Sequence, residues 1–124
     1  MLGGGSWGTV LAHLASLNGY EVTLWMRDED LANQINTEKI NGNYLPGLSL
    51  KDNLVATSVI QKISNSNSII YCIPSDAFRE VAVSAEPYIS VETNLVSATK
   101  GVESSGFNLM SKIPVSYTHL RAHE

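Results

Sequence analysis

A glycine-rich turn near the start of the chain constrains the fold more than any other feature. Gly3, Gly5 and Gly8 have the spacing G-x-G-x-x-G, and the apolar residues of 10–17 then recur with helical spacing. In a dinucleotide-binding turn the first glycine allows a tight bend. The second lets a pyrophosphate approach the backbone, and the third lets the helix pack closely on a strand. With a helix behind it, this spacing favours a nucleotide site over an ordinary glycine-rich turn.

The order of predicted elements indicates an α/β fold. We predict strands at 21–25, 54–57, 68–73 and 94–98, and helical segments at 10–17, from 29 onward, at 59–63 and from 75 onward. Such an alternation is typical of a Rossmann-like, doubly wound parallel sheet with right-handed crossovers. The carboxylates at 28–30 predict a helix start, and Ser75 predicts a helix N-cap. In the first helix we expect an apolar side with Val10, Leu14 and Leu17, and a polar side with Thr9, His13 and Ser16.

The strand that should precede the glycine turn is almost absent, because only Met1 and Leu2 stand before Gly3. A mean strand has about 5–6 residues. In a dinucleotide-binding sheet this strand is central. We therefore expect a chain whose first strand is truncated.

Composition excludes several classes of protein. A net charge of −4 argues against a broad nucleic-acid-binding surface, and the single Cys72 excludes a disulfide scaffold or a cysteine-based zinc cluster. The acidic residues at 28–30 have no histidine nearby, so we expect no metal site. No apolar run approaches the ~20 residues that span a membrane, and the start does not resemble a signal peptide. We expect a cytoplasmic protein.

Two basic residues follow predicted strands, where ligands of open α/β sheets bind. Arg27 lies two residues beyond Trp25, where an acid would bind the ribose hydroxyls of NAD and an arginine holds the 2′-phosphate of NADP. Arg27 therefore favours NADP, although the adjacent Asp28 keeps NAD open and a solvated arginine is an alternative. Lys100 follows the last predicted strand, and there a phosphate-neutralising or carbonyl-polarising role and a solvated loop position are equally compatible with the spacing.

Several motifs together resemble the bacterial type of NAD(P)-dependent glycerol-3-phosphate dehydrogenase. They are Leu-Gly-Gly-Gly-Ser-Trp-Gly-Thr at 2–9, the segment 19–25 with Arg27-Asp28, Asn-Tyr-Leu-Pro-Gly at 43–47, Ile-Pro-Ser at 73–75, Arg-Glu-Val at 79–81, and Ala-Thr-Lys-Gly at 98–101. The resemblance covers residues 2–113, which correspond to the family's cofactor domain. Gly4 stands where the family commonly has alanine, a difference that we expect to be harmless.

The resemblance implies reduction of dihydroxyacetone phosphate to sn-glycerol 3-phosphate for phospholipid synthesis, with no nucleic-acid partner and a full enzyme that is a homodimer. It implies cofactor contacts from Gly3, Gly5, Ser6, Trp7, Gly8, Arg27, Tyr44 and Lys100, with Lys100 also touching substrate. The family's proton-donating lysine belongs to a C-terminal helical domain, and nothing in this chain matches it. We therefore assign no catalytic residue and expect the chain alone to be inactive.

The same resemblance sets the expected domain boundaries. We assign 1–114 to an incomplete NAD(P)-binding domain, in a chain cut at both ends. The tail at 115–124 resembles a translated sequencing-adapter peptide, and we leave it out of the fold. Two other functions stay open on the sequence. One is a different Rossmann-fold dehydrogenase of the ketopantoate or sugar-nucleotide type, and the other is a non-catalytic nucleotide-binding module.

Overall fold

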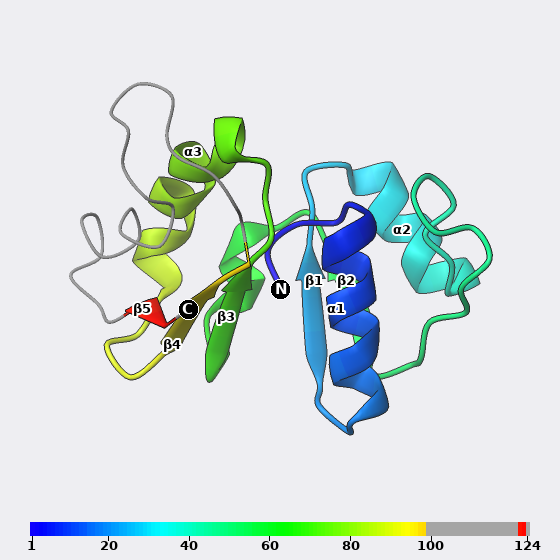
Figure 1. Cartoon of the computed structure of the whole chain (residues 1–124), viewed down its shortest axis with the longest axis horizontal. Coiled ribbons are helices and arrows are strands. Elements are labelled where there is room, and N and C mark those ends of the chain that lie inside the picture. Colours follow the sequence, from blue (N-terminus) through cyan, green and yellow to red (C-terminus); the bar gives the residue numbers. More distant parts are fainter. Residues whose placement is uncertain (99–121, 124) are drawn as a thin grey trace. The chain divides into compact units, whose positions relative to one another are not determined.

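A computed structural model describes residues 1–98 and 122–123, which fall into two compact units, residues 1–59 and 60–124. The first unit contains α1 (Ser6–Leu17), β1 (Val22–Trp25), α2 (Glu29–Glu38) and β2 (Leu54–Thr57) (Figure 1). The second contains the 3-10 turn η1 (Ile60–Ile63), β3 (Ser68–Tyr71), α3 (Ser75–Ala85), the 3-10 turn η2 (Glu86–Tyr88), β4 (Asn94–Ser97) and β5 (Ala122–His123). Parallel strands alternate with helices in both units, which confirms the predicted α/β class.

In the first unit β1 pairs with β2 in parallel, with Leu24 opposite Ala56. The two residues before the glycine turn add to this ladder. Leu2 forms a parallel bridge with Trp25, and the Trp25 N–H donates to the Met1 carbonyl at 2.8 Å. The Met1 amino group donates to the Thr23 carbonyl, and burial lowers its pKa to about 6. Met1 and Leu2 thus take the place of the predicted first strand, beside β1.

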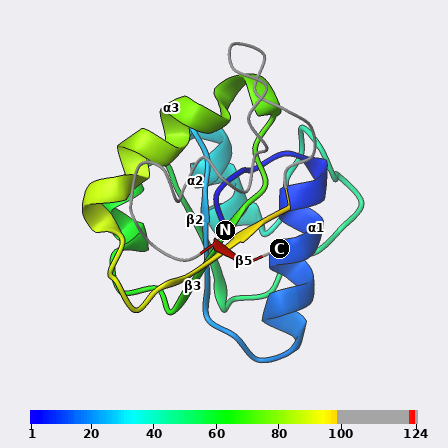
Figure 2. The ribbon, with the colours of Figure 1, turned by 60° about the vertical axis from the view of Figure 1, so that its left-hand side comes forward.

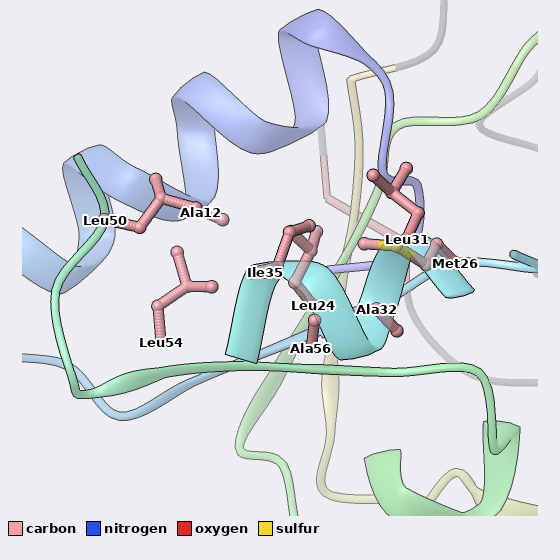
Figure 3. Close-up of a cluster of buried hydrophobic side chains, with 9 residues drawn as sticks. All are labelled: Ala12, Leu24, Met26, Leu31, Ala32, Ile35, Leu50, Leu54 and Ala56. Carbon is pink, nitrogen blue, oxygen red and sulfur yellow. The ribbon is translucent and has the colours of Figure 1, made fainter. Parts of the chain in front are cut away.

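The core of the first unit is built where the two helices meet the strands. Side chains from α1, β1, α2 and β2 converge in one buried cluster (Figure 3), which consists of Ala12, Leu24, Met26, Leu31, Ala32, Ile35, Leu50, Leu54 and Ala56. Removing this apolar area from water stabilises the unit by roughly 25 cal/mol per Å². The cluster joins the middle of α1, through Ala12, to β1, α2 and β2.

The predicted sides of α1 are wrong. Its buried residues are Gly8, Thr9, Ala12 and Ser16, whereas Leu14 and Leu17 are 47% and 53% exposed. A helix that carries small residues on its inner side can approach a strand more closely than one that carries leucines, as the third glycine of the motif requires. Hydroxyl groups are tolerated in that position because each finds a local acceptor; Ser16 Oγ, for example, donates to the His13 carbonyl at 2.7 Å.

The predicted start of α2 is confirmed. Asp28 is its N-cap and accepts a hydrogen bond from the Leu31 N–H at 3.0 Å, and Glu29 and Asp30 follow in the first turn. Carboxylates here satisfy otherwise unpaired N–H groups and interact favourably with the helix dipole.

The second unit has the parallel order β3-β4-β5, in which the tail residues Ala122–His123 pair with Leu95 and Val96 of β4 (Figure 2). The sequence predicts that the tail 115–124 lies outside the fold, whereas these two residues pair with β4. Helix α3 packs through buried Phe78, whose ring lies 5.2 Å from that of Tyr71 on β3. Ser75 is the first residue of α3 rather than its N-cap; Pro74 is the cap residue and no side chain caps the helix.

Candidate functional site

The glycine turn leaves the ladder at the carboxyl end of the Met1-Leu2 segment and leads into α1. Gly3 has φ 126°, a conformation that residues with a Cβ rarely adopt. Its N–H donates to the Trp25 carbonyl at 2.9 Å, which ties the turn to the end of β1. The sharp bend expected of the first glycine is therefore present.

The N-terminus of α1 is suited to an anion. Gly5 is the N-cap, no side chain caps the helix, and its first turn contains no acidic residue. The first N–H groups of a helix have no partner within it and carry a partial positive charge. Ser6 and Trp7 are exposed at this end, with the Trp7 side chain 57% exposed, whereas Gly8 is buried. These features fit a phosphate group of the predicted dinucleotide.

The two neighbouring glycines of the turn serve different needs. A Cβ built on Gly5 would meet nothing within 4 Å, so a ligand can approach its backbone. A Cβ on Gly4 would lie 2.7 Å from Met26 Cε and 2.8 Å from Met26 Cβ. The absence of a side chain at Gly4 thus makes room for Met26, the residue that follows β1, whereas a side chain at Gly5 would meet no protein atom.

Arg27 is exposed in the turn between β1 and α2, at the same carboxyl edge of the strands as the glycine turn. The neighbouring Asp28 uses a carboxylate oxygen to cap α2. Asp28, the acidic residue that could bind the ribose of NAD, therefore has a structural role as a helix cap. Arg27 lies at the edge of the strands where the sequence predicts a contact with the 2′-phosphate.

A buried asparagine that the sequence analysis did not select joins three parts of this region. Asn41 is 0% exposed; its Nδ2 donates to the Gly4 carbonyl at 3.0 Å and to Thr9 Oγ1 at 2.9 Å. Its Oδ1 accepts from the Tyr44 N–H at 3.3 Å. The loop that carries the half-exposed Tyr44 is thereby attached to the glycine turn. An asparagine in a long loop has no sequence signal for such a contact; the nearest motif is the Asn-Tyr-Leu-Pro-Gly segment at 43–47.

The described residues outside this region add little chemistry. Lys100 lies outside the described residues. Burial raises the pKa of Tyr71 to about 12 and also raises the pKa of the Cys72 thiol, so neither is ionised at neutral pH. Among residues 1–98, 122 and 123, no group of three or more His, Cys, Asp or Glu is placed to hold a metal ion. No helix in that same part of the chain is long and apolar enough to cross a membrane.

The sequence matches the family described as "NAD-dependent glycerol-3-phosphate dehydrogenase N-terminus" over residues 1–120. It is 45% identical over 114 residues to the glycerol-3-phosphate dehydrogenase [NAD(P)+] of Saccharophagus degradans, an alignment that covers 91% of this chain and 32% of that protein. The chain therefore spans about a third of the length of the curated relatives that it matches.

Comparison with solved structures gives the same family. The crystal structure of glycerol-3-phosphate dehydrogenase from Coxiella burnetii superposes with a TM-score of 0.89 at 29% identity, covering 98% of this chain and 37% of that one. A ketopantoate reductase from Ralstonia eutropha, a member of one alternative class, reaches a TM-score of 0.69 at 16% identity, covering 98% and 38%. That likeness shows a shared fold alone. By its sequence match and its relatives, the chain belongs to the family of NAD-dependent glycerol-3-phosphate dehydrogenases and corresponds to their N-terminal part.

Proposed function

We propose that the chain is the NAD(P)-binding part of a glycerol-3-phosphate dehydrogenase, which reduces dihydroxyacetone phosphate to sn-glycerol 3-phosphate for glycerophospholipid synthesis in the cytoplasm. The observation that carries the proposal is the open backbone of Gly5 at the uncapped N-terminus of α1, in a chain of this family. The homodimeric state of the full enzyme is part of the same proposal and rests on the family resemblance.

Each site residue has a physical role in this proposal. Gly3 bends the chain, Gly5 and Ser6 present backbone N–H groups to the pyrophosphate, and Gly8 allows α1 to pack closely. The exposed rings of Trp7 and Tyr44 supply apolar surface for the cofactor. Bound NAD(P)H would supply the hydride that is transferred to the carbonyl carbon of the substrate.

Lys100 is assigned by family motif to both cofactor and substrate, where its ammonium group would neutralise phosphate or polarise the carbonyl. The proton-donating lysine of the family has no match in this chain. Residues 1–114 therefore serve as the cofactor-binding domain in our proposal, and the tail at 115–124 has no role in it.

Cofactor binding without turnover tests this proposal. We expect the purified chain to bind NADPH, measured by enhancement of the nicotinamide fluorescence. With dihydroxyacetone phosphate added, we expect no steady loss of absorbance from NADPH, because the proton-donating lysine is lacking. Failure to bind NADPH would contradict the proposed cofactor role. Steady oxidation of NADPH by the pure chain would contradict the proposal that this chain binds the cofactor but lacks a residue needed for turnover.

Arg27 is proposed to select NADP. Replacing Arg27 by alanine should weaken NADPH binding by about 1.5–3 kcal/mol, which is roughly 10- to 150-fold in Kd, since a charge-assisted contact is lost. NADH has no 2′-phosphate, so its Kd should change little. Fluorescence titration with both cofactors measures the difference.

Lys51→Ala is the matched control for Arg27. Lys51 is exposed and precedes β2, at the opposite edge of the strands, so its loss removes one positive charge from the same unit without touching the site. It should leave both Kd values unchanged. Equal losses of NADPH and NADH affinity in Arg27→Ala would show that Arg27 does not read the 2′-phosphate.

A further inference from the structure

We propose that Asn41 is a positioning residue, which orients the Gly4–Gly5 peptide for phosphate binding and attaches the Tyr44 loop to it. The inference rests on the proposed cofactor-binding role and names a residue outside the glycine motif. Asn41 is fully buried, and three hydrogen bonds engage its side-chain amide.

The partners of Asn41 determine which way its amide points. The Gly4 carbonyl can only accept a hydrogen bond and the Tyr44 N–H can only donate one. Nδ2 must therefore face Gly4, and Oδ1 must face Tyr44. Thr9 Oγ1 completes a triangle of hydrogen bonds with Asn41 Nδ2 and the Gly4 carbonyl. It accepts from Asn41 at 2.9 Å and donates to the Gly4 carbonyl at 3.4 Å.

This arrangement controls the peptide that the ligand would meet. The described peptide bonds are all trans, and in a planar trans peptide the C=O and the following N–H point in opposite directions. A Gly4 carbonyl that is held toward the buried Asn41 therefore directs the Gly5 N–H away from it. A Cβ on Gly5 would meet nothing within 4 Å, so this side of the backbone leaves room for a phosphate oxygen to approach that N–H.

The same side chain connects this peptide to the Tyr44 loop. The backbone of Asn41 also accepts from the Leu45 N–H at 2.8 Å, so residues 41–45 form a tight turn. The Tyr44 N–H also donates to the Asn41 backbone carbonyl at 3.3 Å, so the side chain and the backbone of Asn41 together hold this turn, while the side chain alone bonds to Gly4. We therefore expect that a change at Asn41 alters the order of both the glycine turn and the Tyr44 loop.

Asn41→Asp tests the proposal, because it keeps the shape and the acceptor but replaces the donor that faces Gly4 by a carboxylate oxygen. The Kd for NADPH at pH 8 should rise at least ~10-fold, since the hydrogen bond to the Gly4 carbonyl is replaced by a repulsive contact between two acceptors, and the Thr9 hydroxyl turns from Gly4 to the carboxylate. Burial at this position raises the pKa of the introduced carboxyl, so on acidification to pH 5 it takes up a proton and regains one donor. Part of the affinity should then return, relative to the unsubstituted chain at the same pH.

Asn36→Asp is the matched control. Asn36 on α2 likewise donates to a backbone carbonyl and accepts from a backbone N–H, both of Ala56 at 2.8 Å, in the same unit but with no contact to the glycine turn. It should lower the thermal unfolding temperature while leaving the Kd for NADPH and its pH dependence unchanged. Equal Kd changes in the two variants would reduce Asn41 to a stabilising residue and overturn the proposal.

Two further measurements cover the other outcomes. If Asn41→Asp does not fold, Thr9→Val is the second test, because it removes the hydroxyl that bonds to Asn41 and Gly4 at nearly constant side-chain volume. It should raise the Kd for NADPH about 3-fold. An unchanged Kd would overturn the proposal. If the unsubstituted chain does not bind NADPH, the proposed function fails. Hydrogen exchange then decides the positioning role. Exchange at 3–9 and 41–48 should accelerate in Asn41→Asp and not in Asn36→Asp, and equal rates would overturn it.

Discussion

Replacing Gly5 by alanine should abolish most of the NADPH affinity of this chain while leaving its fold intact. The backbone at Gly5 has φ −76° and ψ −169°, which alanine adopts freely, and the added Cβ would touch nothing in the protein. It would occupy the space through which the pyrophosphate reaches the backbone. We expect the Kd for NADPH to rise about 100-fold, equivalent to about 2.7 kcal/mol.

Urea unfolding should show a loss of no more than about 1 kcal/mol for Gly5→Ala, the usual scale of an N-cap change. Gly47→Ala is the matched control, because a Cβ there also meets nothing within 4 Å. It should leave the Kd unchanged. A Gly5→Ala chain that bound NADPH normally would show that the pyrophosphate does not approach this backbone.

Replacing Gly4 by alanine should lower the free energy of unfolding, unlike Gly5→Ala, which should mainly lower the affinity for NADPH. The new Cβ would lie 2.8 Å from Met26 Cβ, a contact that movement of the flexible end of the methionine cannot relieve. Overpacking of this kind costs about 1–3 kcal/mol. Met26 is 4% exposed, so Met26→Gly alone should cost about 2–5 kcal/mol through the cavity that it leaves.

The double variant Gly4→Ala with Met26→Gly tests the coupling. The methyl group then enters space that the methionine has vacated, so the double variant should be more stable than the sum of the single effects by about 1–3 kcal/mol. Urea unfolding of the four chains gives this coupling directly. Additive losses would mean that the close approach of Gly4 to Met26 does not limit the residue at position 4.

Much of the fold could be predicted because its signals are local. The strand Val22–Trp25 and the strand Leu54–Thr57 follow from apolar and β-branched residues, and the start of α2 follows from the carboxylates after Arg27. The turn conformation of Gly3 likewise follows from the motif. Each of these depends on residues that are adjacent in the chain.

The inner side of α1 could not be predicted from apolar periodicity. The periodicity assigned Leu14 and Leu17 to the core, but the structure buries Thr9 and Ser16 instead. Close packing of the helix selects small residues, and their hydroxyl groups find acceptors that are visible only in three dimensions. Ser75 is a related case, because α3 begins at that residue with Pro74 as its cap residue, and no side chain caps it.

The spacing of Gly3, Gly5 and Gly8, together with the place of Arg27 after the next strand, was enough to predict a dinucleotide site at this turn. Tertiary structure decided how that turn is held. Asn41 reaches Gly4 across 37 positions and Thr9 across 32, and a buried amide makes such bonds only when the fold has brought acceptors of the right kind to it. Spacing along a chain specifies which backbone groups can meet a ligand. Packing between distant segments specifies the direction in which those groups point.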